Sequence, residues 1–174
     1  MTQLPLEAQP KGVFYMATDI HLKIDGIKGE GTADKHTEEI EILSWQWGIT
    51  HPVSFSGTGM SGGKANIQDL CVHKYVDKAS PNLLKYCLNG KHLPEMVLCQ
   101  QRSGEGAMEY IKITLKDAMI AGVQNNGVNG GEVPKESVNI AFGKVEYEYT
   151  PQKTDGKPDG AVALKWDCKA NKEA

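Results

Sequence analysis

Most of the chain alternates between apolar and polar residues, the two-residue period of a β-strand with one buried face. The first such stretch runs from Ile20 to Ile24 and places His21 and Lys23 on its polar face. Shorter stretches with a strand-like pattern occupy residues 67–76, 93–101 and 161–166. The pattern therefore predicts a mainly β fold.

Three longer stretches change the phase of their alternation partway along. Between Ile42 and Leu43 the apolar residues move from even to odd positions, which puts Trp45 and Trp47 on one face, where we expect both to be largely buried. The other slips lie between Leu115 and Ala118 and across Gly143. Side chains alternate strictly along a strand, so a slip within a continuous strand requires a β-bulge and a bend. Such strands predict a curved, closed two-sheet β-barrel.

One segment, SPNLLKYCLNG, has helical character instead. Ser80 is a suitable N-cap, Pro81 suits the first helical position, and Gly90 is a typical stop. The apolar residues at helical spacing are Leu83, Leu84, Cys87 and Leu88, and the polar ones opposite are Asn82, Lys85 and Asn89. A helix this short is unstable alone in water. We therefore predict one short helix flanking the barrel, with its leucine face packed on it.

Two glycine-rich segments, residues 51–64 and 124–132, lack a clear strand or helix pattern. Loops of this length are uncommon in a compact domain and often have a contact role. The first contains Gly59–Gly63, a G-x-S-x-G match centred on Ser61. A hydrolase elbow needs a strand turning into a helix, whereas these flanks predict strand and loop. A phosphate-binding loop is disfavoured because Thr58 and Ala65 occupy two of its required positions.

Metal and redox chemistry are also disfavoured. The five histidines and four cysteines form none of the short-spaced motifs of zinc or dithiol sites. Paired carboxylates, such as those at 146 and 148, fall on outward strand faces, where a general acid or base is not desolvated. We expect no enzymatic activity, no cofactor and no metal.

Charge and hydropathy restrict the partners. The 174 residues carry a net charge of −3 with no basic cluster, which disfavours nucleic acid. No apolar run approaches the roughly 20 residues of a membrane helix, and the N-terminus lacks a secretory signal pattern. We expect synthesis in the cytoplasm and no membrane insertion. Residues 1–15 are interpreted as an N-terminal extension, and residues 16–174 as a single domain.

Longer blocks of sequence resemble the haemolysin-coregulated protein (Hcp) family of bacterial type VI secretion systems. The blocks are DIHLKIDGIKGEG (19–31), EIEILSWQWGI (39–49), KYVDKASPNLLKYCLNGKHLPE (74–95), EYIKITLKDAMI (109–120), VPKESVNIAFGKVEYEYTPQ (133–152) and WDCKANKEA (166–174). The resemblance extends from Ala17 to Asn171. Residues 1–15 have no counterpart in it, and no toxin domain is expected after the barrel.

The resemblance implies a homohexameric ring that stacks into a tube, with a contractile sheath around it and a spike protein at its tip. It also implies that small effector proteins travel in the lumen and that the tube is secreted without a signal peptide. On this interpretation the glycine-rich segment contacts a neighbouring subunit or ring through Phe55, Gly57, Gly59, Met60, Gly62, Gly63 and Lys64. The helix residues Asn82, Lys85 and Asn89 would face the lumen.

Three alternatives stay open at this stage. The nearest is a phage-type contractile tail tube protein, which shares the architecture. The others are a hydrolase that uses Ser61 and a monomeric carbohydrate-binding β-sandwich. The mass in solution separates a ring from a monomer.

Overall fold

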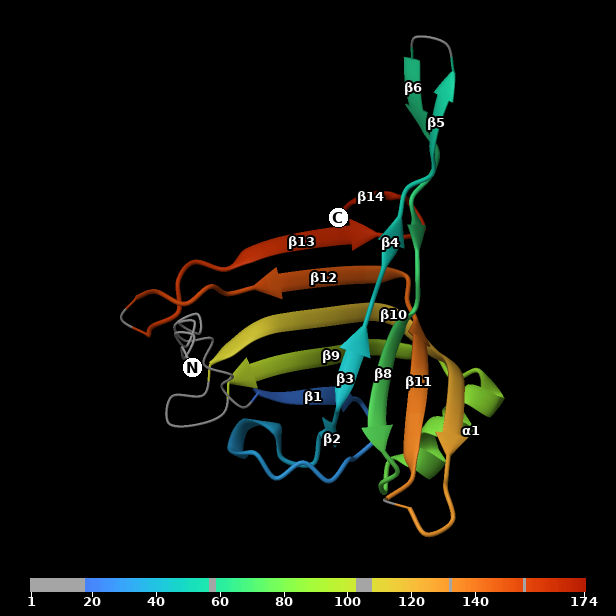
Figure 1. The fold of residues 1–174 in the computed structure, drawn as a ribbon, viewed down its shortest axis with the longest axis vertical. Coiled ribbons are helices and arrows are strands. Elements are labelled where there is room, and N and C mark those ends of the chain that lie inside the picture. Colours follow the sequence, from blue (N-terminus) through green and yellow to red (C-terminus); the bar gives the residue numbers. More distant parts are fainter. Residues whose placement is uncertain (1–17, 57–58, 103–107, 132, 155) are drawn as a thin grey trace, which may run out of the picture.

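The computed structural model describes residues 18–56, 59–102, 108–131, 133–154 and 156–174, which form two curved antiparallel sheets and one α-helix (Figure 1). The N-terminal extension expected at 1–15 lies outside the described residues. The first sheet consists, in order, of β2 (Ile40–Glu41), β1 (Thr18–Ile24), β9 (Leu93–Arg102), β10 (Glu109–Asn126), β12 (Lys144–Tyr149), β13 (Val162–Asp167) and β14 (Lys172–Glu173). The second consists of β10, β11 (Lys135–Ala141), β8 (Leu70–Tyr75) and β3 (Ser44–Gln46).

Strand β10 belongs to both sheets. Its first half pairs with β9 and β12, and its second half, from Met119 onward, pairs with β11. Between the halves, Asp117 has a φ of 52°, and the Gly143 N–H donates to the carbonyls of Lys116 and Asp117. The buried residues change from odd to even positions between Leu115 and Ala118, but the pairing of β10 with β9 continues there without a register shift. Strand β10 does contain register shifts, but they lie between Glu109 and Ile111 and between Ile120 and Gly122, so the prediction of a bulge between Leu115 and Ala118 is wrong in its position.

The other two phase slips were also predicted to be bulges in continuous strands, and this prediction is wrong. Each of them is a crossing from one sheet to the other. The Ile42 N–H donates to Ile20 of the first sheet, and the next N–H, of Leu43, donates to His73 of the second. Likewise β11 ends in the second sheet and β12 begins in the first across Gly143. The expected closure is also not seen, since no described strand pair joins β3 to an edge of the first sheet. The mainly β, two-sheet prediction is confirmed.

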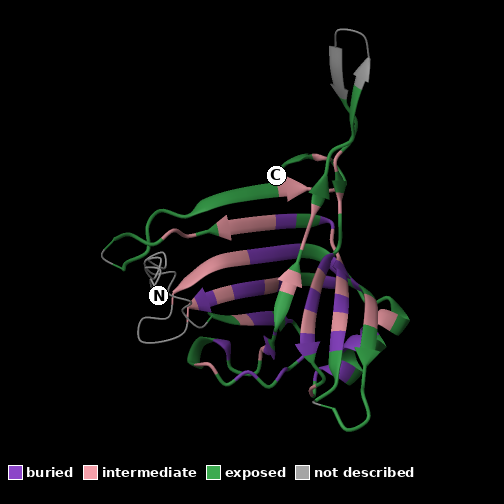
Figure 2. Cartoon of the chain, in the orientation of Figure 1, coloured by how far each residue is buried: buried purple, intermediate pink, exposed green. Residues whose placement is uncertain are grey.

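The hydrophobic core fills the space between the sheets. Leu22, Leu98 and Ile113 lie opposite one another on three adjacent strands, and each is at most 1% exposed. Figure 2 shows that the buried residues concentrate where the sheets cross, whereas most of β13 is exposed. Trp45 and Trp47 are only half-buried, contrary to expectation, because Trp45 is on β3, the outer strand of its sheet, and Trp47 lies just beyond the end of that strand. Their indole N–H groups donate to the Gln100 side chain and the Gln68 carbonyl.

Helix α1 (Ser80–Asn89) packs against β10 and ends at Gly90, whose φ is 59°. The predicted helix and its stop are confirmed, but Ser80 is the first helical residue rather than the N-cap, and its hydroxyl bonds elsewhere. The buried face is Leu83 and Tyr86, and Leu88 is 88% exposed, so the prediction that all the leucines pack on the barrel is wrong. None of the helices in the described part of the chain has the length and apolarity to cross a bilayer.

Candidate assembly interface

Residues 47–68, here called the arm, leave the second sheet as a narrow two-stranded projection (Figure 1). Strand β4 (Ile49–Thr50) pairs with β7 (Asn66–Ile67), and farther out β5 (Val53–Ser56) pairs with β6 (Gly59–Gly62). The segment predicted as an irregular loop is therefore a β-hairpin. Its glycine and serine content hides the strand period, because glycines leave no side chain to mark a face.

Two glycines allow the arm strands to approach closely. A Cβ on Gly62 would lie 2.5 Å from Nε2 of His51, and one on Gly63 would lie 3.0 Å from Cγ of Pro52. The Gly63 N–H donates to the Pro52 carbonyl at 2.9 Å. A larger residue at Gly62 requires the His51 side chain to move, and one at Gly63 requires the Pro52 ring to shift slightly.

The arm brings most of the predicted interface residues together. Phe55 and Met60 are directly opposite in register, Gly59 is opposite Ser56, and Gly62 is opposite Val53. Lys64 follows and is exposed, whereas Gly57 lies outside the described residues. A two-stranded ribbon without a covering layer is marginally stable in water.

The residues predicted to face the lumen lie elsewhere, on α1. Asn82, Lys85 and Asn89 are all exposed. Leu84 and Leu88 are exposed as well, so the outer face of this helix is mixed rather than purely polar. Figure 1 places α1 beside the second half of β10, far from the arm, so the two predicted sites are separate surfaces.

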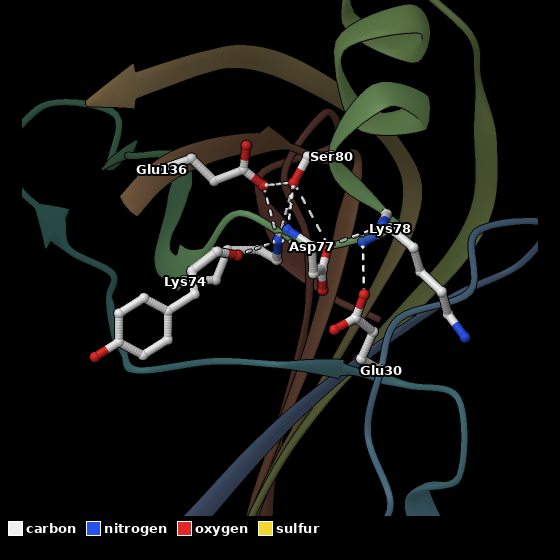
Figure 3. Close-up of polar contacts among 8 residues, drawn as sticks. Glu30, Lys74, Asp77, Lys78, Ser80 and Glu136 are labelled. Atoms are coloured by element: carbon white, nitrogen blue, oxygen red, sulfur yellow. Dashed lines mark hydrogen bonds and ion pairs between the residues drawn. The ribbon is translucent and has the colours of Figure 1, made fainter. Parts of the chain in front are cut away.

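A buried ionic cluster that the sequence analysis missed connects the second sheet to α1 (Figure 3). Lys74 Nζ donates to Glu136 Oε1 and Asp77 Oδ1, both at 2.8 Å, and to the Tyr75 carbonyl at 2.6 Å. The Ser80 hydroxyl donates to the same Glu136 oxygen at 2.7 Å. Lys74 is 1% and Glu136 2% exposed.

The sequence does contain a signal for this cluster. Lys74 continues the buried alternation of Leu70 and Val72, and Glu136 precedes that of Val138 and Ile140. A single charge at a core-facing position is costly, but two opposite charges at such positions indicate an internal pair. The strand register places Lys74 directly opposite Glu136.

Two histidines stack on the other side of the first sheet. The rings of His21 and His36 are 4.4 Å apart and inclined by 7°. Both are buried, so the assignment of His21 to an exposed polar face is wrong: the segment that carries His36 covers this part of β1. His36 Nδ1 lies 2.8 Å from Glu39 Oε2. Neighbouring Cys99 is an unreactive thiol, because burial, assisted by Glu109, raises its pKa to about 12.

A family model described as "Type VI secretion system effector, Hcp" matches residues 21–149. The chain belongs to the Hcp family. The similar protein hcp1 of Pseudomonas aeruginosa is 40% identical over 162 residues, which cover 91% of this chain and 100% of that protein. The resemblance identified from the sequence blocks is thus confirmed, and with it a family of type VI secretion effectors and tube proteins.

Solved structures agree with this assignment. The crystal structure of Hcp1 from Salmonella typhimurium is 43% identical, with a TM-score of 0.75, and the match covers 91% of this chain and 100% of that one. A structure described as a type six secretion system protein has a TM-score of 0.86 at 29% identity, with the same coverage. Hcp proteins are secreted by the type VI system and form a structural family. Ser61 lies in strand β6 of the hairpin, and not at the turn from strand to helix that a hydrolase elbow requires.

Within this Hcp fold, acid is expected to destabilise the protein through His21. Burial, followed by the effect of His36, lowers the pKa of His21 below its ordinary value of 6.5. Below pH 6.5 the unfolded chain binds a proton more readily than the folded protein does. The free energy of unfolding therefore has its full value above pH 6.5, and it falls as the pH decreases toward the pKa of His21 in the folded protein. The slope for one proton is at most about 1.4 kcal/mol per pH unit.

Urea denaturation at pH 7.5, 6.5 and 5.5 measures this effect. The His21→Leu variant should lose part of the pH dependence, whereas His92→Gln, at an exposed position, should retain it. Identical pH profiles for His21→Leu and the wild type would show that His21 does not titrate in this window.

Proposed function

We propose that this chain is the repeating subunit of a type VI secretion inner tube. Six copies close into a ring, rings stack into a tube, and the tube carries small effector proteins in its lumen. Family membership supports the type VI role, and the arm is the feature of this chain that most favours self-assembly. A thin hairpin that projects away from the body gains stability when another surface covers it.

Open sheet edges support the same proposal. Strands β14, β2 and β3 each have one side unpaired within the described sheets. An edge strand pairs readily with another chain, and a contact between two different patches produces rings or helical stacks. Repetition around a ring multiplies weak contacts into a stable tube.

The remaining parts of the proposal concern partners and cargo. A contractile sheath surrounds the tube and a spike protein caps it. The exposed residues Asn82, Lys85 and Asn89 of α1 face the lumen and contact the effectors. Their amide and ammonium groups hydrogen-bond to cargo without a deep pocket, which suits transient binding. Mass measurement and negative-stain microscopy of the wild type, in dilute and in concentrated solution, test the ring directly, and a species that is monomeric at all concentrations contradicts it.

The Gly59→Asp substitution in the arm is expected to weaken assembly without unfolding the sheets. A buried, unpaired carboxylate costs at least about 1.4 kcal/mol, which raises the concentration needed for assembly about tenfold or more. Gly127→Asp is the matched control, because a Cβ at Gly127 meets no atom within 4 Å. Sedimentation and negative-stain microscopy measure assembly, and thermal unfolding measures folding. Undiminished assembly of Gly59→Asp would rule out a contact at this position.

A further inference from the structure

The second glycine-rich segment has no part in the proposed function, and it contains two asparagine–glycine pairs. Asn126–Gly127 lies at the end of β10 and Asn129–Gly130 lies in the following turn, and all four residues are exposed. In Figure 1 the loop that joins β10 to β11 is at the lower end of the molecule. A third pair, Asn89–Gly90, is exposed at the end of α1. Asparagine before glycine is prone to cyclise, because glycine places no side chain beside the attacking backbone nitrogen.

No hydrogen bond between described residues blocks cyclisation at the two loop pairs. The side chains of Asn126 and Asn129 bond to no other described residue. The N–H groups of Gly127 and Gly130 likewise donate to no other described residue. A Cβ at either glycine would meet no atom within 4 Å, so the space beside both nitrogens is open. Each side-chain amide is therefore free to fold back onto the nitrogen that follows it.

The pair at the end of α1 is constrained on both sides. Asn89 Oδ1 accepts a hydrogen bond from the Lys91 N–H at 3.0 Å, and the Gly90 N–H donates to the Cys87 carbonyl at 3.4 Å. Gly90 is the left-handed stop of the helix, with a φ of 59°. Cyclisation at Asn89 has to break both bonds and open the last helical turn. The fold therefore protects this asparagine although it is exposed.

We propose that Asn126 and Asn129 are sites of spontaneous deamidation and that Asn89 is not. The backbone nitrogen of the following glycine loses its proton to solvent and attacks the asparagine Cγ, which closes a succinimide ring. The Cγ–Nδ2 bond breaks, and the nitrogen takes a proton from water and leaves as ammonia. A second water molecule then adds to either ring carbonyl and opens the ring to aspartate or isoaspartate. The reaction requires neither an enzyme nor assembly, so it is independent of the proposed function.

The two products have different effects on the hairpin of β10 and β11. Either one adds a negative charge to a chain whose net charge is −3. At position 126 the new carboxylate of aspartate is in register with Lys135, and opposite charges across an antiparallel pair stabilise it. Isoaspartate instead routes the main chain through Cβ, and the added backbone atom disrupts the register with Lys135. Aspartate is therefore expected to hold the end of the hairpin together, and isoaspartate to loosen it.

Peptide mass spectrometry of the folded wild type, after incubation in mildly alkaline buffer and digestion in mild acid, tests the assignment. Both products should accumulate at 126 and 129 at a rate that does not depend on protein concentration, whereas Asn89 should stay unmodified. Asn125 is the internal control, because it is exposed but is followed by asparagine. In guanidinium chloride Asn89 should lose its protection, and the three pairs should react at similar rates. The proposal is overturned if Asn89 reacts as fast as Asn126 in the folded protein, or if either loop position reacts no faster than Asn125.

A substitution tests the role of the glycine nitrogen. Gly127→Ala places a methyl group beside it and should slow conversion of Asn126 about tenfold, which corresponds to about 1.4 kcal/mol in the activation barrier. The variant should fold, because a Cβ at Gly127 meets no atom within 4 Å, and Asn129 should react as before. Gly160→Ala is the matched control, since it is equally unobstructed and does not follow an asparagine. Conversion of Asn126 at the wild-type rate in Gly127→Ala contradicts the proposal.

Discussion

Replacing Lys74 with methionine is expected to lower the free energy of unfolding by about 3–5 kcal/mol, the effect of removing one member of a buried ion pair. The substitution leaves the Glu136 carboxylate, which is 2% exposed, without its cation, and it removes the bonds to Asp77 and to the Tyr75 carbonyl. These contacts hold the end of β8 and the start of β11 against the start of α1, so the substitution should destabilise the helix as well.

Urea denaturation followed by tryptophan fluorescence measures this loss. Lys116→Met is the matched control, since its ion pair with Glu95 spans 4.0 Å between half-exposed side chains and should contribute under about 1 kcal/mol. The double variant Lys74→Met with Glu136→Leu should recover much of the loss, because it leaves no unpaired charge buried. A loss below about 1 kcal/mol for Lys74→Met would mean that water reaches Glu136.

Shortening Leu98 to alanine is expected to cost about 2–5 kcal/mol. Leu98 is 1% exposed on β9 and lies in register between Leu22 on β1 and Ile113 on β10. Backbone pairing on both sides prevents the strands from closing the space that the side chain leaves, so the cavity should persist and the cost should be toward the upper end of that range.

Val162→Ala is the control for this second prediction. Val162 is on a strand of the same sheet but is 68% exposed, so the change should stay within about 0.5 kcal/mol. Both variants can be compared by urea denaturation at one pH. Equal stabilities of Leu98→Ala and Val162→Ala would contradict the strand register described above.

The strand period predicted much of the fold because most strands bury one face. In β8 and β11 the buried residues alternate as expected, and the positions of Pro81 and Gly90 correctly located α1. The crossing at Ile42 and Leu43 was not predicted, because a change of sheet and a bulge produce the same slip in a one-dimensional pattern. Only the partners, Ile20 and His73, distinguish them.

The candidate site was less predictable than the fold. The arm was recognised by its glycines as a contact segment, but its hairpin pairing was not, since glycine has no side chain to show a period. A surface groove of about 560 Å³ was not predicted at all: it combines residues from β1, the β2–β3 crossing, the end of β8 and Val133. Segments this distant in sequence acquire a common surface only through tertiary packing. His21 was misplaced for the same reason, because the segment that buries it is not its strand neighbour.

Strand β10, shared by the two sheets over its 18 residues, has a mechanical consequence. Because β10 pairs with β9 and β12 in one sheet and with β11 in the other, separating β10 from either sheet is expected to disturb its pairing in the other. Under mechanical load the two sheets are therefore expected to yield together, and not one after the other.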